Sequence, residues 1–291
     1  MMFVVKTPLG KEVNGAKRWI RLPFNQQLQP AEIAKIAIIL FIPALICSMG
    51  KEIKPWKGIG RIMAWGGISA AVVFLITDNL STAIIVMGIT CILILVVHPR
   101  TKMLVGILGI IGVIGITGAR ILGLILETSG SFRMRRILVW VNPEKYASEG
   151  GYQIMQALYA IGSGGFFGKG LGNSAQKMII PEVQNDMILS IICEELGVFG
   201  AIMVLVLFGL LLYRLLFIAQ NAPDMYGSLI VTGIFAHIAL QVTLNVMVVI
   251  NCIPTTGITL PFISYGGTSV LFLMAEMGIA LGVSSRIKIT E

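Results

Sequence analysis

Apolar runs of helix length restrict the fold of this chain more than any other feature. Each run is close to the roughly 20 residues that a helix needs to cross a bilayer. Because the runs are too long for the alternating strands of about ten residues found in membrane barrels, the sequence predicts an all-α polytopic membrane protein. We expect membrane spans at about residues 31–49, 58–76, 80–97, 103–126, 187–213, 228–250 and 264–283.

The charge content supports this class and restricts the partners. Only 12% of the residues are charged, whereas a soluble globular domain has about 25%. The formal net charge is +8, but the basic residues lie between the apolar runs, which favours anionic lipid head groups or an anionic lipid substrate over nucleic acid. The four cysteines show no metal-ligand spacing and are interpreted as small membrane-buried side chains.

Basic residues are unevenly distributed over the short turns, which predicts the orientation. The turns at 77–79 and 251–263 contain no Lys or Arg. Under the positive-inside rule, we therefore expect a cytoplasmic C-terminus, with residues 11–30 and 127–185 forming outward-facing loops. Nine Lys or Arg residues lie in the turns of the opposite side, near residues 50–61, 98–102, 214–224 and 284–291.

The stretch from Gly162 to Gly197 combines glycines, two lysines and four acids: GSGGFFGKGLGNSAQKMIIPEVQNDMILSIICEELG. Its glycine-rich part is similar in composition to a phosphate cradle, but the spacing GxxxxGK[ST] is absent, so nucleotide binding is not supported. Asp186 precedes the fifth expected span. It is either a helix N-cap or a general base whose pKa is tuned by the apolar boundary.

Glu194 and Glu195 fall within that span, where an acid indicates function by default and tethering of neighbouring helices is the alternative. Glu194 follows Asp186 by eight residues, or about 12 Å along a helix. This exceeds the roughly 5–9.5 Å between paired glycosidase carboxylates. A hydrolase built on these two carboxylates is therefore disfavoured.

Three further groups have both a bland and a functional interpretation. Glu32 and Lys35 share one face of a helix, where Lys35 either meets an anionic substrate or extends to the interface. Arg18 lies beside Trp19 in a cluster that is either an interfacial anchor or an anion site. Ser264 and Tyr265 fall in a turn-rich segment, PTTGITLPFISYGGTS, whose backbone amides are suited to an anion.

Taken together and in order, these stretches resemble the SEDS family (FtsW, RodA, SpoVE) over nearly the whole chain. Family members have ten spans, so seven would imply that the first three are missing here. The family's QPSE is QPAE in this chain, with Ala31 in place of serine, and TDNLSTA is closer to the FtsW and SpoVE branch than to RodA. The matching segments are GAKRWI, QPAEIAK, DNLSTA, GYQIMQALYAIGSGGFFGKGLGNSAQK, PEVQNDMI, EELGVFG and PTTGITLPFISYGGTS.

The resemblance implies a peptidoglycan glycosyltransferase of cell division, sporulation or cell shape, in the bacterial plasma membrane. Residues 1–291 would form one SEDS membrane domain, with 127–185 as its large outward-facing loop and an extracytoplasmic active site. Asp186 would be catalytic, while Glu194 and Glu195 would have structural or coupling roles. The expected substrate-binding residues are Arg18, Glu32, Lys35, Lys169, Ser264 and Tyr265.

The expected partners also follow from the resemblance. They are lipid II, a class B penicillin-binding protein that cross-links the glycan, and the divisome or related wall-synthesis proteins. No residue is predicted to bind a metal, although Mg²⁺ or Mn²⁺ is a candidate for neutralising the departing pyrophosphate. Two other functions are alternatives. Acids inside the membrane and spans interrupted by glycines also suit a lipid II flippase, and a non-catalytic scaffold for the transpeptidase is the second alternative.

Overall fold

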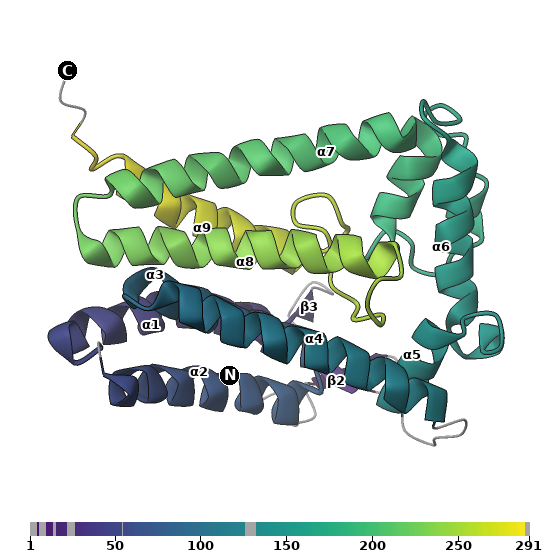
Figure 1. Ribbon diagram of the computed structural model, residues 1–291. Helices are drawn as coiled ribbons and strands as arrows, with labels where there is room; N and C mark the ends of the chain where they lie inside the picture. The colour runs from purple at the N-terminus through teal and green to yellow at the C-terminus, as the bar shows by residue number, and fades with distance from the viewer. Residues whose placement is uncertain are drawn as a thin grey trace. The chain divides into compact units, whose positions relative to one another are not determined.

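The computed structural model describes residues 5, 10–13, 16–21, 27–53, 55–125 and 132–288. In that part of the chain, seven helices are long and apolar enough to cross a membrane, which confirms the predicted all-α class and number of spans. They are α1 (Pro30–Met49), α2 (Trp56–Thr77), α3 (Leu80–Val97), α4 (Thr101–Ile125), α7 (Ile188–Asn221), α8 (Met225–Val249) and α9 (Gly267–Ser284), labelled in Figure 1.

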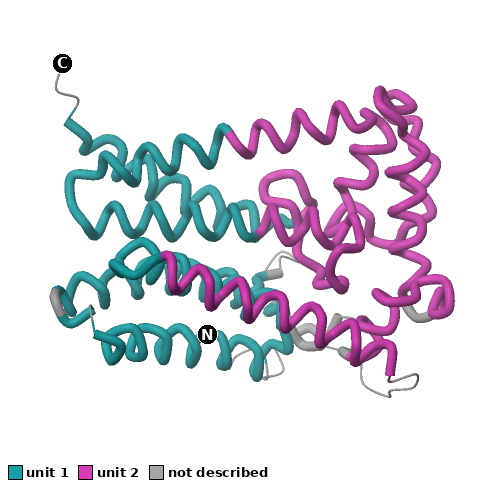
Figure 2. Tube along the Cα trace, viewed as in Figure 1, with its two compact units in different colours: residues 1–101, 210–240, 266–291 teal, residues 102–209, 241–265 magenta. Residues whose placement is uncertain are grey.

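The chain forms two compact units, coloured separately in Figure 2. Unit 1 contains residues 1–101, 210–240 and 266–291, and unit 2 contains residues 102–209 and 241–265. Helices α7 and α8 are therefore each divided between the two units. The glycine-rich stretch and Asp186 belong to unit 2.

In unit 1, α1, α2 and α3 pack against one another, and α1 also contacts α9. Ile39, Ile42 and Ile46 of α1 are fully buried and form part of its core. At Gly66 of α2, a Cβ would lie 2.5 Å from the side chain of Thr90 on α3. The missing side chain at this position lets the two helices approach closely, as small residues do between membrane helices.

Residues 11–30 differ from the predicted loop. Most of them form a three-stranded antiparallel sheet, β1 (Gly10–Val13), β2 (Ala16–Arg21) and β3 (Gln27–Leu28), in that order. The register pairs Val13 with Ala16 and Gly10 with Ile20. The sequence between β1 and β2 is Asn14-Gly15, the strongest short hairpin signal, which the prediction of a loop did not take into account.

Residues 127–185 also contain regular structure, with α5 (Phe132–Val141) and α6 (Gly151–Gly164) as its main elements. Two short 3₁₀ helices, η4 (Ala147–Glu149) and η5 (Gln176–Met178), lie in the same segment, and a third, η3 (Gly50–Ile53), follows α1. Neither α5 nor α6 reaches the length of a span. The prediction that this segment faces outward stays a prediction.

Helix α7 is broken at Gly197, whose φ of 72° and ψ of −172° are not helical. Figure 1 shows its first turns set at an angle to the long remainder. The break frees backbone groups, and the glycine-rich loop satisfies them: the amides of Lys169 and Gly170 donate to the carbonyls of Glu194 and Glu195, each over 2.9 Å. In return, the amides of residues 198 and 199 donate to the carbonyls of residues 165 and 166.

This pairing explains two of the glycines. A Cβ on Gly168 would lie 2.2 Å from the carbonyl oxygen of Glu195, and a Cβ on Gly197 would lie 2.2 Å from that of Phe166. Both glycines also have positive φ angles, 77° and 72°, which side chains of L-residues disfavour. A broken helix is tolerated in a membrane only where neighbouring groups satisfy its backbone, and here the loop does so.

Candidate functional site

Asp186 lies two residues before α7, half-buried among elements of unit 2. Its carboxylate accepts no hydrogen bond from the amides of the first turn of α7, all of which belong to the described chain. The N-cap interpretation is therefore not supported by these contacts. The carboxylate oxygen Oδ1 instead lies 3.5 Å from the amide nitrogen of Gln153 on α6, at the long limit of a hydrogen bond.

Asp186 has a charged side chain among its neighbours and the backbone of a loop beside it. The guanidinium of Arg136 on α5 interacts electrostatically with it, and donates to the carbonyl of Thr255 over 3.1 Å. A Cβ added to Gly257 would lie 4.0 Å from Oδ2 of Asp186, so the loop of residues 251–263 passes beside the carboxylate without a side chain there.

Burial has the largest effect on the pKa of Asp186 and raises it above the ordinary value. The neighbouring carboxylate of Glu182 raises this pKa as well. A backbone hydrogen bond, the guanidinium of Arg136 and the amide of Gln153 lower it, but the net shift is upward. A carboxyl with a raised pKa is a stronger base than an exposed aspartate and is suited to general-base chemistry.

Asn245 of α8 holds the segment that carries Asp186. Its side-chain amide donates to the backbone carbonyl of Asp186 over 2.8 Å and to that of Ile258 over 2.7 Å. One turn earlier, Gln241 donates to the carbonyl of Thr259 over 3.0 Å. This polar face of a membrane helix fixes both the Asp186 segment and the loop that passes beside it.

We expect Asn245→Leu to destabilise the protein by about 1–3 kcal/mol, because two buried carbonyls lose their donor. The midpoint of thermal unfolding in detergent measures this effect. Asn221→Leu is the matched control, since Asn221 is exposed and donates only within its own helix. Equal midpoints for the two variants would contradict the bridging role of Asn245.

Glu194 is the most heavily bonded acid in the described chain, and its side chain is fully buried. It forms an ion pair of 2.7 Å with Lys169 and accepts hydrogen bonds from the hydroxyls of Ser163 and Ser174 over 3.4 Å and 2.5 Å. The backbone amides of residues 175 and 176 also donate to it. These five donors attach the glycine-rich loop to α7, which fits the predicted structural role of Glu194.

Lys169 accordingly lies in this tether. Its ammonium also donates to the hydroxyl of Ser163 over 2.8 Å, and its side chain keeps 35% exposure. A substrate contact by Lys169 stays a prediction. Glu195 differs from Glu194, because its Oε1 is buried without a hydrogen-bond partner in the described part of the chain.

The predicted span of 264–283 would have placed Ser264 and Tyr265 inside the helix. The structure instead places both in the turn before α9. The buried hydroxyl of Ser264 accepts from the amide of Leu260 over 2.7 Å and so fixes the loop. The backbone amide of Tyr265 donates to the carbonyl of Gln184 over 2.8 Å, while its side chain is 77% exposed. The exposed ring is therefore the part of this pair that is accessible to a ligand.

Glu32 and Lys35 share one face of α1, as their spacing predicted, and form a buried ion pair of 2.9 Å in unit 1, so Lys35 does not extend to an interface there. The hydroxyl of Ser269 on α9 lies 3.5 Å from Glu32. Arg18 lies on β2, and its side chain is outside the described residues. The structure thus brings Glu32 and Lys35 together and places Asp186 in a separate group of unit 2.

Three neighbours of Asp186 were not among the predicted site residues: Arg136, Gln153 and Asn245. Arg136 was one of many cations in a segment interpreted as loop, and only the helical structure of α5 selects it. Asn245 carries a sequence signal, since His237, Gln241 and Asn245 are spaced by four and share one helix face. His237 uses this face in unit 1, where it lies 2.8 Å from the buried carboxylate of Glu276.

Comparison with known families places the whole chain in one group. The family model FTSW_RODA_SPOVE, described as "Cell cycle protein", matches residues 1–289. Stage V sporulation protein E of Bacillus subtilis is 38% identical over 288 residues, which cover 98% of this chain and 75% of the relative. The "Probable peptidoglycan glycosyltransferase FtsW" of Trichlorobacter lovleyi is 35% identical over 298 residues, with 99% and 74% coverage.

Solved structures show the same fold. A chain from the structure described as "Structural coordination of polymerization and crosslinking by a peptidoglycan synthase complex" has a TM-score of 0.76 at 25% identity, covering 99% of this chain and 80% of that one. A variant of the rod shape determining protein RodA from Thermus thermophilus has a TM-score of 0.60 at 25% identity, with 99% and 77% coverage. Both agree with the seven-span arrangement described above.

Proposed function

The chain belongs to the FtsW/RodA/SpoVE family, also called SEDS, and from this premise we propose that it is a peptidoglycan glycosyltransferase that polymerises lipid II. It would transfer the growing glycan from undecaprenyl pyrophosphate onto the 4-hydroxyl of lipid II, in cell division or sporulation. The relatives from Bacillus subtilis and Trichlorobacter lovleyi support both the activity and this choice of processes. The active site would face the extracytoplasmic side of the plasma membrane, with the C-terminus in the cytoplasm.

The observation that carries this proposal is the environment of Asp186. A hydroxyl that attacks an anomeric carbon needs one base. The carboxylate of Asp186 suits this role because it does not cap α7, is half-buried and has a raised pKa. The pyrophosphate leaves with its own negative charge and needs no acid, only neutralising cations. One carboxylate beside a cation is therefore sufficient for this transfer, which would invert the configuration at the anomeric carbon.

Several residues are proposed for the negative charge of the substrate. Arg136 interacts with Asp186 in unit 2 and is the cation that the structure adds to the predicted set. Lys35 remains a proposed substrate contact, with Glu32 orienting it. The other proposed contacts are Arg18, Lys169, Ser264 and Tyr265. These roles follow from family matches and charge.

A divalent cation, Mg²⁺ or Mn²⁺, is proposed as an additional source of neutralising charge. In phosphate sites Mg²⁺ commonly uses one or two carboxylates together with the substrate's phosphates. In the described part of the chain, no group of three or more His, Cys, Asp or Glu side chains gathers for a metal.

The proposed partner is a class B penicillin-binding protein, within the divisome or a related wall-synthesis assembly. The solved structure described as a peptidoglycan synthase complex supports such a partnership. The flippase alternative predicts charges along a path through the membrane. Two of the intramembrane acids are already paired, Glu194 with Lys169 and Glu276 with His237, which favours the glycosyltransferase.

The direct test incubates fluorescent lipid II with the chain purified together with its transpeptidase partner. We expect a ladder of glycan products on a gel. A second preparation contains the whole sporulation relative, of which the match covers 75%, with its own partner. Lipid II that stays monomeric in both preparations, but crosses vesicle membranes, would replace this proposal with the flippase.

The pH dependence of polymerisation provides an internal check on the base. Only the deprotonated carboxylate accepts a proton, so the rate should fall about tenfold per pH unit below the pKa of Asp186. Because burial raises that pKa, the acidic limb should lie above the ordinary aspartate value of about 3.9. The same shift means that ionisation of Asp186 is unfavourable in the folded state. The contribution of this one group to the free energy of unfolding is therefore fully present below about pH 3.9 and is lost as pH rises through the raised pKa.

Two substitutions should move this limb in opposite directions. Arg136→Gln removes a cation that lowers the pKa of Asp186, so the limb should move to higher pH. Glu182→Gln removes an anion that raises it, so the limb should move to lower pH. Initial rates measured across the acidic range give both midpoints, and a limb that ignores both changes would belong to another group.

A further inference from the structure

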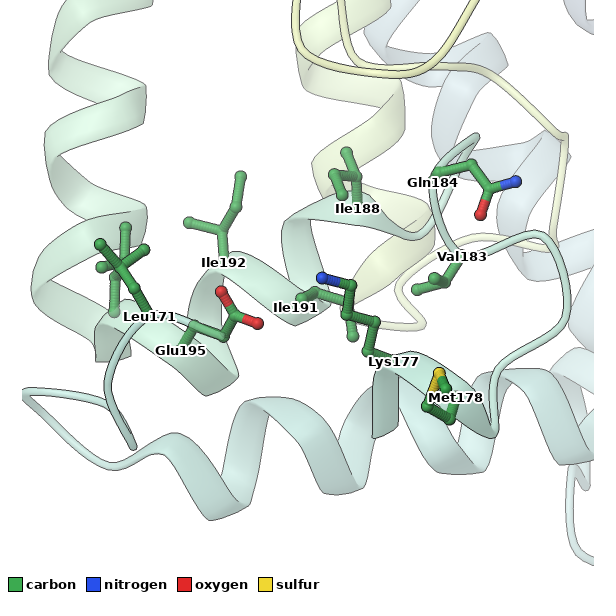
Figure 3. Close-up of a pocket in the computed structure, with 10 residues that line it drawn as sticks. Leu171, Lys177, Met178, Val183, Gln184, Ile188, Ile191, Ile192 and Glu195 are labelled. Carbon is green, nitrogen blue, oxygen red and sulfur yellow. The ribbon is translucent and has the colours of Figure 1, made fainter. Parts of the chain in front are cut away.

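A pocket of about 410 Å³ lies in unit 2, between the start of α7 and the loop that returns from the glycine-rich segment. It lies at the beginning of α7, one of the seven helices that are long and apolar enough to cross a membrane. Figure 3 shows side chains of both segments facing this space. The walls are mainly apolar and are formed by Leu171, Met178, Val183, Ile188, Ile191 and Ile192.

Two charged side chains interrupt these walls. Glu195 of α7 and Lys177 of η5 both line the pocket, and Figure 3 shows the Lys177 side chain extending toward the side on which the Glu195 carboxylate lies. The described residues contain no ion-pair partner for either group. They therefore place one negative and one positive charge in the same apolar pocket, without joining them to each other.

Glu195 carries a second, independent sign of an incomplete site. Its Oε1 is buried and accepts no hydrogen bond in the described chain. Burying a carboxylate oxygen without a donor is costly, more so for a charged group than for a neutral one. Its neighbour Glu194 has five donors, so the fold is able to satisfy an acid at this depth and does not do so for Glu195.

We propose that this pocket binds an aminophospholipid, with its ammonium on Glu195, its phosphate on Lys177 and its acyl chain along α7. An ammonium donates charge-assisted hydrogen bonds to a carboxylate, and a lysine does so to a phosphate. A trimethylated head group has the same charges but no N–H to donate. A head group that is only anionic meets the repulsion of Glu195.

The pocket shares a wall with the segment of the proposed base. Val183 and Gln184 line it just before Asp186, and Ile188 lines it just after. The carbonyl of Gln184 also accepts the amide of Tyr265. A bound lipid would therefore hold the segment between these residues and position Asp186 without touching the reacting atoms.

Native mass spectrometry of the detergent-purified chain tests this site. The probes are dilauroyl phosphatidylethanolamine, phosphatidylcholine and phosphatidylglycerol, each titrated separately. We expect phosphatidylethanolamine to bind about tenfold more tightly than the other two, a ratio that corresponds to about 1.4 kcal/mol. Glu195→Gln and Lys177→Gln should each reduce that preference to about twofold or less.

The matched controls are Glu144→Gln and Lys102→Gln, exposed residues of unit 2 outside the pocket. Both should keep the wild-type preference. Equal binding of the three lipids, or a preference that survives both pocket substitutions, would overturn the proposal. A third result would also overturn it: Glu195→Gln raises the thermal stability of the lipid-free protein and leaves the lipid preference unchanged. Glu195 would then only destabilise the fold and would not bind a lipid. Lipid retention requires no turnover, so failure of the glycosyltransferase function would leave this readout intact.

Discussion

Replacement of Asp186 by asparagine is expected to abolish the glycan ladder from fluorescent lipid II, with a rate loss of at least about 10²–10⁴. The variant keeps the shape of the side chain and the bond from Asn245, which reaches the backbone carbonyl of residue 186 and not its side chain. It loses only the capacity to accept a proton. The measurement is the initial rate of polymerisation by gel, at matched protein and lipid II concentrations.

Two controls separate chemistry from folding and binding. Asp186→Asn should bind lipid II with an affinity close to that of the wild type and should retain its thermal stability at neutral pH or gain some, because ionisation at this position is unfavourable. Glu144→Gln, a change at an exposed acid of unit 2, should leave the ladder intact. A ladder that persists in Asp186→Asn would assign the base to another group.

Replacement of Glu194 by alanine should have the largest effect on stability, lowering the free energy of unfolding by about 3 kcal/mol. The substitution leaves Lys169, two hydroxyls and two backbone amides without their shared acceptor. Thermal unfolding measures the loss. Hydrogen exchange of residues 164–178 should rise with it, because the glycine-rich loop is attached to α7 through this carboxylate.

The reverse design sharpens this prediction. Removing one partner of a buried pair is costly, whereas replacing both by apolar residues is often close to neutral. The double variant Glu194→Leu with Lys169→Met should therefore recover part of the stability lost in either single variant. Strict additivity of the two single losses would show that the ion pair does not couple loop and helix.

The spans were predictable because their signal is local. An apolar run of about 20 residues has few alternatives to a membrane helix, and α3 begins and ends as expected at Leu80 and Val97. The acids of the site were also visible, because charges stand out against such runs. The shared face of Glu32 and Lys35 was visible as well, since a spacing of three places them one above the other, although the ion pair between them was not predicted.

The neighbours of Asp186 depend instead on tertiary contacts. Arg136, Gln153 and Asn245 are separated from Asp186 by 33 or more residues, and no local pattern joins them. The sheet at residues 10–28 was missed for a different reason, because the prediction of a loop did not take the hairpin signal into account. The different surroundings of Glu194 and Glu195 could not be predicted either, since the two are adjacent residues of the same type and only the folded chain distinguishes their neighbours.

The broken turn of α7 has a consequence for biogenesis. Residues 198–221 alone still meet the roughly 20-residue requirement of a span, so a translocon can release that part into the bilayer before the glycine-rich loop has docked. The carbonyls of Glu194 and Glu195, in the turns before Gly197, acquire their backbone donors only when residues 169 and 170 fold onto them. Correct threading and formation of the proposed site around Asp186 are thus separate events, and we expect a variant defective in docking to accumulate in the membrane at normal levels while remaining inactive.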